Sequence, residues 1–302
     1  MSSSSPMTVL VSGASGFIGT ELVAGLRAEG HRVNRLVRRA PRSADERQWA
    51  PDELSVPQSA IDEADAIVNL SGASLSRLPW THAYKRTILM SRVRATTTLA
   101  EAIARSATPP SVFVSGSAVG FYGDRPGENL TEGSEQGTGF LPRVVESWEA
   151  AAAKAVPHTR VVFPRTGLVV GDGGALTPLM MLAKLGLAGP LGTGHQYWPW
   201  ISLHDEAAAI RYLITSSTLG GAVNLAGPHP ASAGDIAHSL AAQLKRPYWL
   251  PAPSWAIKAA LADAGSELLL ADQRVIPERL LADGFTFRDV TADQAIAAAL
   301  SR

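Results

Sequence analysis

Short runs of apolar, mostly β-branched residues alternate with longer amphipathic segments over the first half of the chain. The apolar runs lie at residues 8–12, 32–37, 66–72, 111–117 and 160–170. Helical patterns lie at residues 20–29, 83–106 and 139–154. Continuous apolar strands that alternate with helices are typical of a parallel sheet covered on both faces. The pattern therefore predicts an α/β protein with a doubly wound parallel sheet.

The pattern changes after Gly171, where glycine and proline become frequent and aromatic residues cluster at 194–202. Further helical patterns begin near His204 and Ser232, and the tail from Tyr248 is mostly helical. A change of period and composition at one point indicates a second unit. We expect a smaller, mostly helical C-terminal substrate lobe laid over the carboxyl edge of the sheet.

The composition narrows the class of protein. Of 302 residues, 46% are hydrophobic and 18% are charged, which predicts a globular chain. Lys+Arg and Asp+Glu are both 27, so the zero net charge argues against nucleic-acid or membrane partners. The absence of cysteine excludes disulfides and thiolate chemistry, and the spacing of the histidines predicts no metal site. The opening MSSSSP lacks the features of a signal peptide, so we expect a cytoplasmic protein.

Three glycines form a G-x-x-G-x-x-G pattern between the first predicted strand and the first predicted helix. They are Gly13, Gly16 and Gly19. Glycine at such a turn permits positive φ and a close approach of the backbone to a phosphate. The helix that follows presents free N–H groups and the positive end of its dipole to a pyrophosphate. The pattern predicts a Rossmann-type dinucleotide site.

The end of the second predicted strand indicates which dinucleotide binds. NAD sites usually place an acidic residue there for the ribose hydroxyls. Val37 stands in that place, and Arg38 and Arg39 follow, with Arg35 and Arg42 nearby. The planar fork of arginine suits a 2′-phosphate. We expect NADP(H), with Arg38 as the main contact and Arg39 as the second; the alternative is a solvated basic edge.

These observations give an expected division of the chain. Residues 1–7 form a disordered leader, and residues 8–170 form the NADP-binding Rossmann domain, to which about 201–228 return. Residues 171–200 and 229–302 form the substrate lobe and the C-terminal helical region.

Several stretches resemble the extended branch of the short-chain dehydrogenase/reductases, the NAD-dependent epimerase/dehydratase superfamily. They are VSGASGFIG, AIVNLSGAS, FVSGSAVGFYGD and WISLHDEAAAI. Within that branch, WTHAYKRTILMSRVRATTTLAEAI and GGALTPLMMLAKLGLAGPLGTGHQYWPWI resemble the YfcH-like group of sugar-nucleotide epimerase-like proteins. The tail ELLLADQRVIPERLLADGFTFR is similar to the small C-terminal domain of that group, and the resemblance covers residues 8–300.

The resemblance implies roles for residues along the cofactor. Gly13, Ser15, Gly16, Phe17, Ile18 and Gly19 would line the pyrophosphate. Leu70, Ser71, Gly72 and Ala73 would pass under the adenine-side ribose. Ser115 would approach the nicotinamide side, and Pro164 and Arg165 would flank the nicotinamide.

Enzymes of this superfamily usually carry a serine or threonine, a tyrosine, and a lysine four residues after the tyrosine. The tyrosine exchanges a proton with the substrate, and the lysine lowers the pKa of the tyrosine. Ser117 matches the serine, but Leu141 and Val145 stand at the tyrosine and lysine positions. No Tyr-x-x-x-Lys occurs between residues 123 and 154.

Other residues are candidates to supply the chemistry. Ser117 and Tyr122 are the catalytic candidates, although a packing role would also explain Tyr122. Glu146 and Glu149 lie on the predicted helix at 139–154, where a solvated face is the alternative. The residues expected to face a substrate are Arg77, Trp80, Lys184, His195, Gln196 and Trp198, with packing or simple exposure as the alternative for each.

The leading functional hypothesis is an NADP(H)-dependent oxidoreductase or epimerase acting on a small polar, sugar-like substrate. The alternative is a non-catalytic NADPH-binding sensor or scaffold, which the missing tyrosine and lysine favour. The resemblance also implies a homodimer formed through the helices at 83–106 and 139–154.

Overall fold

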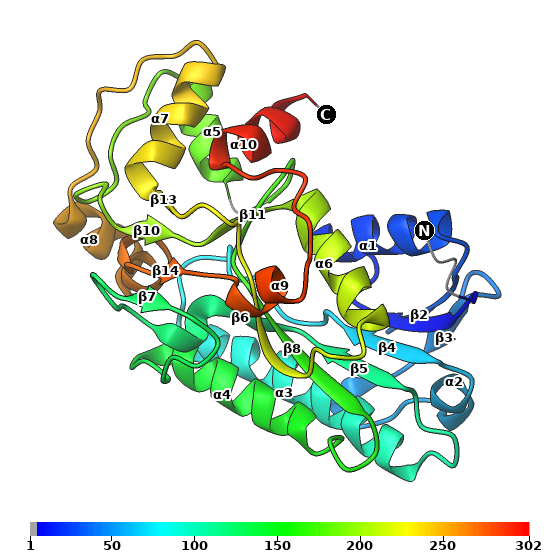
Figure 1. Ribbon diagram of the computed structural model, residues 1–302. Helices are drawn as coiled ribbons and strands as arrows, with labels where there is room; N and C mark the ends of the chain where they lie inside the picture. The colour runs from blue at the N-terminus through cyan, green and yellow to red at the C-terminus, as the bar shows by residue number, and fades with distance from the viewer. Residues whose placement is uncertain (1–4, 175, 302) are drawn as a thin grey trace.

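A parallel sheet lies at the centre of the computed structural model, which describes residues 5–174 and 176–301 (Figure 1). It has eight strands in the order β12-β8-β5-β4-β1-β2-β3, with β6 beside β8. The strands are β1 (Thr8–Ser12), β2 (Arg32–Val37), β3 (Glu46–Gln48), β4 (Ala66–Asn69), β5 (Val112–Ser115), β6 (Ser117–Ala118), β8 (Arg160–Thr166) and β12 (Gly221–Leu225). All their recorded pairings are parallel. The order reverses between β1 and β4, which confirms the doubly wound Rossmann type.

Helices cover both faces of this sheet (Figure 1). On one face lie α1 (Phe17–Ala28) and α6 (Leu203–Thr215), and on the other lie α2 (Gln58–Asp62), α3 (His82–Arg105) and α4 (Phe140–Ala153). Side chains alternate along each strand, so Val9 and Val11 face α1 and α6 while Leu10 faces α2 and α3. The two apolar layers that result hold the sheet between its helices.

Two predicted strands are each divided by a glycine. The segment 160–170 becomes β8 and β9 (Leu168–Val170), because β9 leaves the main sheet to pair with β11 (Trp200–Ser202). Gly167 at the division has the carbonyl of Pro199 where a β-carbon would stand. Gly116 separates β5 from β6, and the indole of Trp148 packs against it. Periodicity cannot reveal these breaks, since both depend on contacts with distant segments.

The C-terminal half forms a smaller lobe with its own apolar core (Figure 1). Its elements are α5 (Thr177–Lys184), β10 (Tyr197–Trp198), β13 (Ala231–Ser232), α7 (Ala233–Gln243), α8 (Ser254–Ala264), the π-helix η3 (Gly265–Leu270) and α10 (Ala292–Leu300). The remaining short elements are η1 (Pro51–Glu53), η2 (Val119–Tyr122), β7 (Asn129–Leu130), β14 (Arg274–Val275) and α9 (Glu278–Ala282). Leu280 of α9 packs into the core beneath the main sheet, so part of the tail belongs to the Rossmann domain.

Two details refine the chain ends and the lobe. Residues 1–4 of the expected leader lie outside the described residues, whereas Met7 accepts a hydrogen bond from the Arg32 amide and packs on the core.

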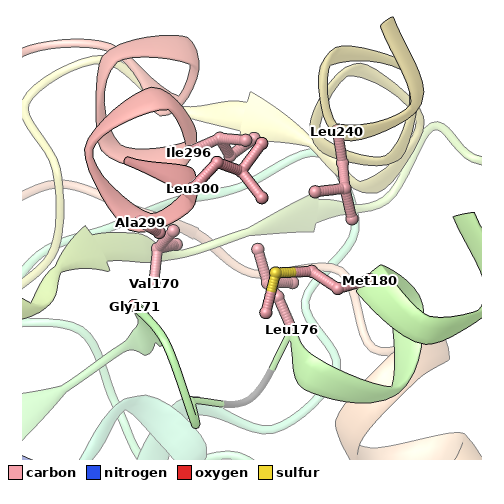
Figure 2. A pocket seen from close by; sticks show the side chains of 8 residues that line it. All are labelled: Val170, Gly171, Leu176, Met180, Leu240, Ile296, Ala299 and Leu300. Atoms are coloured by element: carbon pink, nitrogen blue, oxygen red, sulfur yellow. The ribbon is translucent and has the colours of Figure 1, made fainter. Parts of the chain in front are cut away.

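A cavity of about 10 Å³ lies between α5, α7 and α10, lined by apolar groups such as Met180, Leu240 and Ile296 (Figure 2). Its walls are apolar, and its volume is at the lower limit for holding one water molecule. We therefore interpret it as a packing gap rather than a ligand site.

A buried amide in β2 gives a test of the packing. Asn34 is 1% exposed, and neither polar atom of its side chain has a hydrogen-bond partner among the described residues. Its register partner Leu10 belongs to the apolar layer under α2 and α3. We expect Asn34→Leu to raise the free energy of unfolding by about 1 kcal/mol, because an unsatisfied amide is replaced by an apolar group of similar size.

Urea denaturation of both proteins measures this difference. The matched control is Asn224→Leu, since the Asn224 side chain is fully paired with Tyr122 and the Ile276 carbonyl. That change should lower stability by about 2 kcal/mol. A loss of stability for Asn34→Leu as well would show that Asn34 has a partner that its packing does not reveal.

Candidate functional site

The glycine loop after β1 meets the loop after β4 at the point where the strand order reverses. Gly13 has a φ of +70°, and a β-carbon there would lie 2.7 Å from the carbonyl carbon of Leu70. A β-carbon on Gly19 would collide with the Gly13 carbonyl. Ligands of doubly wound sheets bind in the crevice at this point. The glycines therefore allow the backbone of the two loops to pack closely together at the floor of that crevice.

The first turn of α1 offers hydrogen-bond donors to a ligand. Gly16 is the N-cap residue and supplies no side-chain cap, while Ser15 and Gly16 are exposed. Uncapped N–H groups and the helix dipole favour a phosphate at this end. Phe17 and Ile18, in the same turn, also pack on the core below. The structure thus brings together the six residues expected to line a pyrophosphate.

A buried amide fixes the loop after β4. Asn69 accepts hydrogen bonds from the Ser12 hydroxyl (2.6 Å) and the Ser71 amide (3.2 Å). It donates to the Thr96 hydroxyl on α3 (2.8 Å), which also accepts from the Trp148 indole on α4 (2.9 Å). One side chain therefore ties β1, the β4 loop and α3 together. Sequence reasoning missed Asn69, although an asparagine closing a buried strand is a usable signal.

Ser115 pairs in register with Asn69 at the end of β5. Its hydroxyl is buried and has no hydrogen-bond partner among the described residues. An orphaned polar group at the crevice edge calls for an external partner or a water. The glycine cradle and this hydroxyl are both compatible with a bound dinucleotide.

The arginines after β2 differ in their partners. Arg39 makes a two-pronged ion pair with Glu46 (2.7 Å to each oxygen), and Arg35 pairs with Asp45 and Glu46. The hydrogen bonds from Arg39 and from the Arg42 amide, with the charges of Arg39 and Arg35, lower the pKa of Glu46 to about 2. Arg38 is exposed, and no partner is recorded for it within residues 5–174 and 176–301. Arg38 is therefore free to meet a ligand, whereas Arg39 is already neutralised.

A buried ionic network lies between β6, β8 and α4. Arg165 donates to both carboxylate oxygens of Glu149 (2.9 and 3.0 Å), and Ser117 donates to one of them (2.6 Å). Arg165 also donates to the Tyr122 hydroxyl (3.1 Å), which donates to Asn224 (2.6 Å). The network joins the two catalytic candidates, Ser117 and Tyr122, through the ion pair of Arg165 and Glu149. Glu149 therefore does not lie on a solvated helix face, which was the alternative for it.

Burial governs the protonation of this network. Burial raises the pKa of Tyr122 above its usual value, although Arg165 opposes the shift. Burial lowers the pKa of Arg165, but the hydrogen bond and charge of Glu149 more than offset it, so Arg165 stays charged. Tyr122 is fully buried and remains a neutral phenol, which makes it a poor base. Ser117, beside a carboxylate, is the better placed of the two hydroxyls.

The helix α4 carries no proton-transferring group at the two expected positions. Leu141 and Val145 are both buried, and a β-carbon on Gly120 would lie 3.2 Å from that of Leu141. Glu149 follows Val145 by one turn on the same face. Glu146 is exposed and accepts a hydrogen bond from Gln136. The first proton acceptor on this face is therefore Glu149, one turn beyond Val145.

Pro164 and Arg165 lie inside β8. Their side chains point to opposite faces of the sheet, and that of Arg165 is held beneath α4. This places the Arg165 guanidinium in the ionic network rather than free at the crevice. Its proposed contact with a nicotinamide stays a prediction.

The six expected substrate residues fall into two groups. Trp80, Gln196 and Trp198 are buried and donate to main-chain carbonyls of Leu75, Leu191 and Leu269, so they support the local fold. Arg77, Lys184 and His195 are exposed, and Arg77 stacks over the Tyr84 ring. Only the exposed group has polar atoms free for a substrate, and its role stays a prediction.

Neither a metal site nor a membrane span is found in the described part of the chain. No group of three or more His, Cys, Asp or Glu side chains there could hold a metal ion. None of the helices there is long and apolar enough to cross a bilayer.

Residues 9–226 match the profile described as the NAD dependent epimerase/dehydratase family, and residues 252–299 match a domain of unknown function, DUF1731. The chain is 38% identical over 296 residues to epimerase family protein MT2273 of Mycobacterium tuberculosis, covering 97% of this chain and 98% of the relative.

Two solved structures are similar over the whole fold. One is human epimerase family protein SDR39U1 (isoform 2) with NADPH, with a TM-score of 0.90, 33% identity, and coverage of 98% of this chain and 100% of that chain. The other is a nucleoside-diphosphate sugar epimerase from Corynebacterium glutamicum, with a TM-score of 0.81, 34% identity, and coverage of 98% and 58%.

A buried carboxyl group on α6, paired with the end of β8, gives a pH test. Glu206 is 0% exposed, accepts one hydrogen bond from Thr166 (2.7 Å), and leaves its other oxygen unpaired within the described chain. Burial raises its pKa from 4.5 to about 8. Between these values the unfolded chain binds fewer protons than the folded one, so this group makes stability fall as pH rises.

We expect Glu206→Gln to remove this contribution while keeping the Thr166 contact. The free energy of unfolding of the variant minus that of wild type should then rise by about 1 kcal/mol per pH unit between pH 5 and 8. Thermal or urea unfolding at several pH values measures it. A difference that stays constant over this range would mean that Glu206 is not held neutral.

Proposed function

The chain belongs to the NAD dependent epimerase/dehydratase family, and from that premise we propose that it is an NADP(H)-dependent oxidoreductase or epimerase. Its substrate is small and polar, and sugar-like in chemistry. The observation that carries the proposal is the glycine cradle at the strand-order reversal, where Gly13 meets Leu70 and α1 begins uncapped. The NADPH in the human relative's structure and the name of the Corynebacterium relative support it.

The proposed cofactor contacts run along the crevice. The glycine loop and the first turn of α1 bind the pyrophosphate, and the loop of residues 70–73 lies under the adenine-side ribose. Arg38 meets the 2′-phosphate, since its guanidinium is exposed and unpaired in the described structure. Arg39 contributes less, because Glu46 already neutralises it. Ser115 offers its orphaned hydroxyl on the nicotinamide side.

Ser117 and Glu149 are proposed to move the proton. When bound, the nicotinamide supplies or accepts hydride. The Ser117 hydroxyl donates to Glu149 at 2.6 Å, and Arg165 holds that carboxylate through two hydrogen bonds. A substrate hydroxyl at the Ser117 oxygen then loses its proton to Ser117, which passes its own proton to Glu149. In the opposite direction, Glu149 returns the proton through Ser117 to a substrate carbonyl.

The second candidate function is a non-catalytic NADPH-binding sensor or scaffold. The observation that favours it is the burial of Leu141 and Val145, which stand where the usual proton donor and its activator would be. Tyr122 is also sealed inside the network. Either function is compatible with a homodimer through α3 and α4 and with a cytoplasmic location, which both stay predictions.

The 2′-phosphate contact is tested by Arg38→Ala. This change should weaken NADPH binding about 10- to 100-fold and NADH binding less than twofold, because only NADPH carries the 2′-phosphate. Fluorescence titration gives both dissociation constants. Arg39→Ala is the matched control and should have a smaller effect. Equal losses of NADPH and NADH for Arg38→Ala would refute the NADP assignment.

Turnover separates the two candidate functions. Loss of NADPH absorbance is followed against a panel of carbonyl compounds, and interconversion is followed with nucleotide sugars. If a substrate is found, Ser117→Ala should lower kcat about 100-fold with NADPH affinity unchanged, while Ser111→Ala, directly before β5, should leave kcat unchanged. Tight NADPH binding without turnover of any compound would favour the non-catalytic function.

A further inference from the structure

Residues 253–268, which form α8 and most of η3, leave the substrate lobe, contact the Rossmann domain and return to the lobe (Figure 1). We call this segment the strap. Its Asp263 makes an ion pair with Lys85 in the first turn of α3. Its Glu267 accepts hydrogen bonds from the first two main-chain amides of α4, at 2.9 and 2.7 Å. Two carboxylates of the strap therefore hold the first turns of both helices.

Both ends of the strap are fixed to the substrate lobe by hydrogen bonds. Ala252 lies directly before the strap, and its amide and carbonyl are both bonded to the loop of residues 190–192 (2.9 and 2.8 Å). Leu269 lies directly after the strap, and its carbonyl accepts from the side chains of Gln196 and Trp198 (3.0 and 3.1 Å). The strap can therefore leave α3 and α4 while its two ends stay in place.

The strap is thinly packed between these ends. Of the 11 residues of α8, all within the described chain, only Ile257 and Ala264 are buried. Trp255, a large apolar side chain of the same helix, is 74% exposed. Few buried apolar contacts are typical of segments that open locally while the rest of the fold stays intact.

The backbone of the strap is also strained. Ala262 has a φ of 49° and a ψ of −129° inside α8, a conformation that a residue with a β-carbon rarely adopts. The π-helix that follows is a rare form, and such turns are frequent at functional sites. Strained residues persist where surrounding contacts hold them, and they cluster at ligand clamps and switch segments. The contacts of Asp263 and Glu267 flank the strained part on its C-terminal side.

The strap lies over the part of the crevice where chemistry is expected. Helices that follow parallel strands begin at the carboxyl edge of the sheet, so the first turns of α3 and α4 border the crevice. Leu141, at the tyrosine position of the superfamily, belongs to one apolar cluster with Ala264 and Leu268 of the strap. Trp80, from the segment between β4 and α3, belongs to the same cluster. A substrate that approaches residue 141 therefore has to displace the strap.

We propose that the strap opens to admit a substrate to the crevice and closes over it. The ion pair of Asp263 and the hydrogen bonds of Glu267 stabilise the closed position, which is the one in this structure. A closed site excludes water and strengthens the electrostatic interactions inside it. The segment that matches DUF1731 begins with the strap, and gating is the role that we assign to this part of it. This role rests on the proposed function, because a gate requires a substrate that reacts behind it.

The chain contains no cysteine, so one introduced thiol can report whether the strap is open. Leu141→Cys places a thiol in the cluster beneath the strap. Ala151→Cys places a buried thiol near the far end of α4, and Ala150→Cys places an exposed thiol beside it. The rate at which N-ethylmaleimide alkylates each full-length variant is measured by mass spectrometry under native conditions. A buried thiol reacts only while the structure above it is open.

If the strap opens locally, the Leu141→Cys thiol reacts about tenfold or more faster than the Ala151→Cys thiol, and more slowly than the Ala150→Cys thiol. Adding Glu267→Gln should raise the Leu141→Cys rate by about tenfold or more and leave the other two rates within about twofold, because a charge-assisted contact is lost. Adding Asp263→Asn should act in the same direction with a smaller effect, and it serves if the Glu267→Gln variant does not fold.

The matched control is Glu278→Gln, which removes an exposed carboxylate of the same tail outside the strap and should leave all three rates unchanged. Equal acceleration of the Leu141→Cys and Ala151→Cys thiols by Glu267→Gln would assign Glu267 to global stability and overturn the gating role. Equal rates for these two thiols without Glu267→Gln would overturn it as well, since residue 141 would then be exposed only by global unfolding.

A titration of wild type with NADPH separates this role from the proposed function. If NADPH does not bind, the proposed function fails, and the thiol rates still decide whether the strap opens. If NADPH binds and the thiol rates show no local opening, only the gating role fails.

Discussion

The close approach of Gly13 to Leu70 is the contact on which the candidate site depends. The loops that meet there leave β1 and β4, the strands between which the order of the sheet reverses. A β-carbon at residue 13 would lie 2.7 Å from the Leu70 carbonyl and would lift the β4 loop from the sheet. That loop carries Gly72 and Ala73, which contact Arg92 on α3. The absence of one side chain therefore sets the positions of three elements at the crevice.

Most buried polar side chains around the crevice find their hydrogen-bond partners within the protein. Asn69 and Thr96 share their hydrogen bonds with Ser12, Ser71 and Trp148, so that cluster is closed. Ser115 lies beside the same cluster, and its buried hydroxyl has no partner within the described chain. Natural folds satisfy nearly all their buried polar groups, and exceptions concentrate at functional sites. The Ser115 hydroxyl borders the crevice that the glycine cradle defines, which supports its interpretation as a ligand contact.

The sequence was sufficient for the central strands, the helices α1, α3 and α4 and the glycine loop, because apolar periodicity and glycine spacing are local properties. The short elements β3 and α2 and the edge strand β12 were not predicted. The strand at 160–170 was predicted as one element, whereas Gly167 divides it because of the Pro199 carbonyl, a contact that no local pattern encodes. Glu149 and Arg165 are 16 residues apart in sequence, and their ion pair depends on how α4 packs on β8. Arg38 and Arg39 look equivalent in the sequence, and only the fold shows that Glu46 neutralises one of them.

The helix α4 shows how the charges of the usual active site are redistributed. Leu141 and Val145 are buried, so the first two turns of the helix present apolar side chains at these positions. A lysine in such apolar surroundings would lose much of its hydration, which disfavours its charged form. The acidic group lies one turn further, at Glu149, where Arg165 compensates it. A positive charge next to this helix comes from α3 instead, where the Arg92 guanidinium stacks on Trp148. Since neither charge stands at the position of the usual lysine, any proton transfer here must use a different donor–acceptor pair from the tyrosine and lysine of the superfamily.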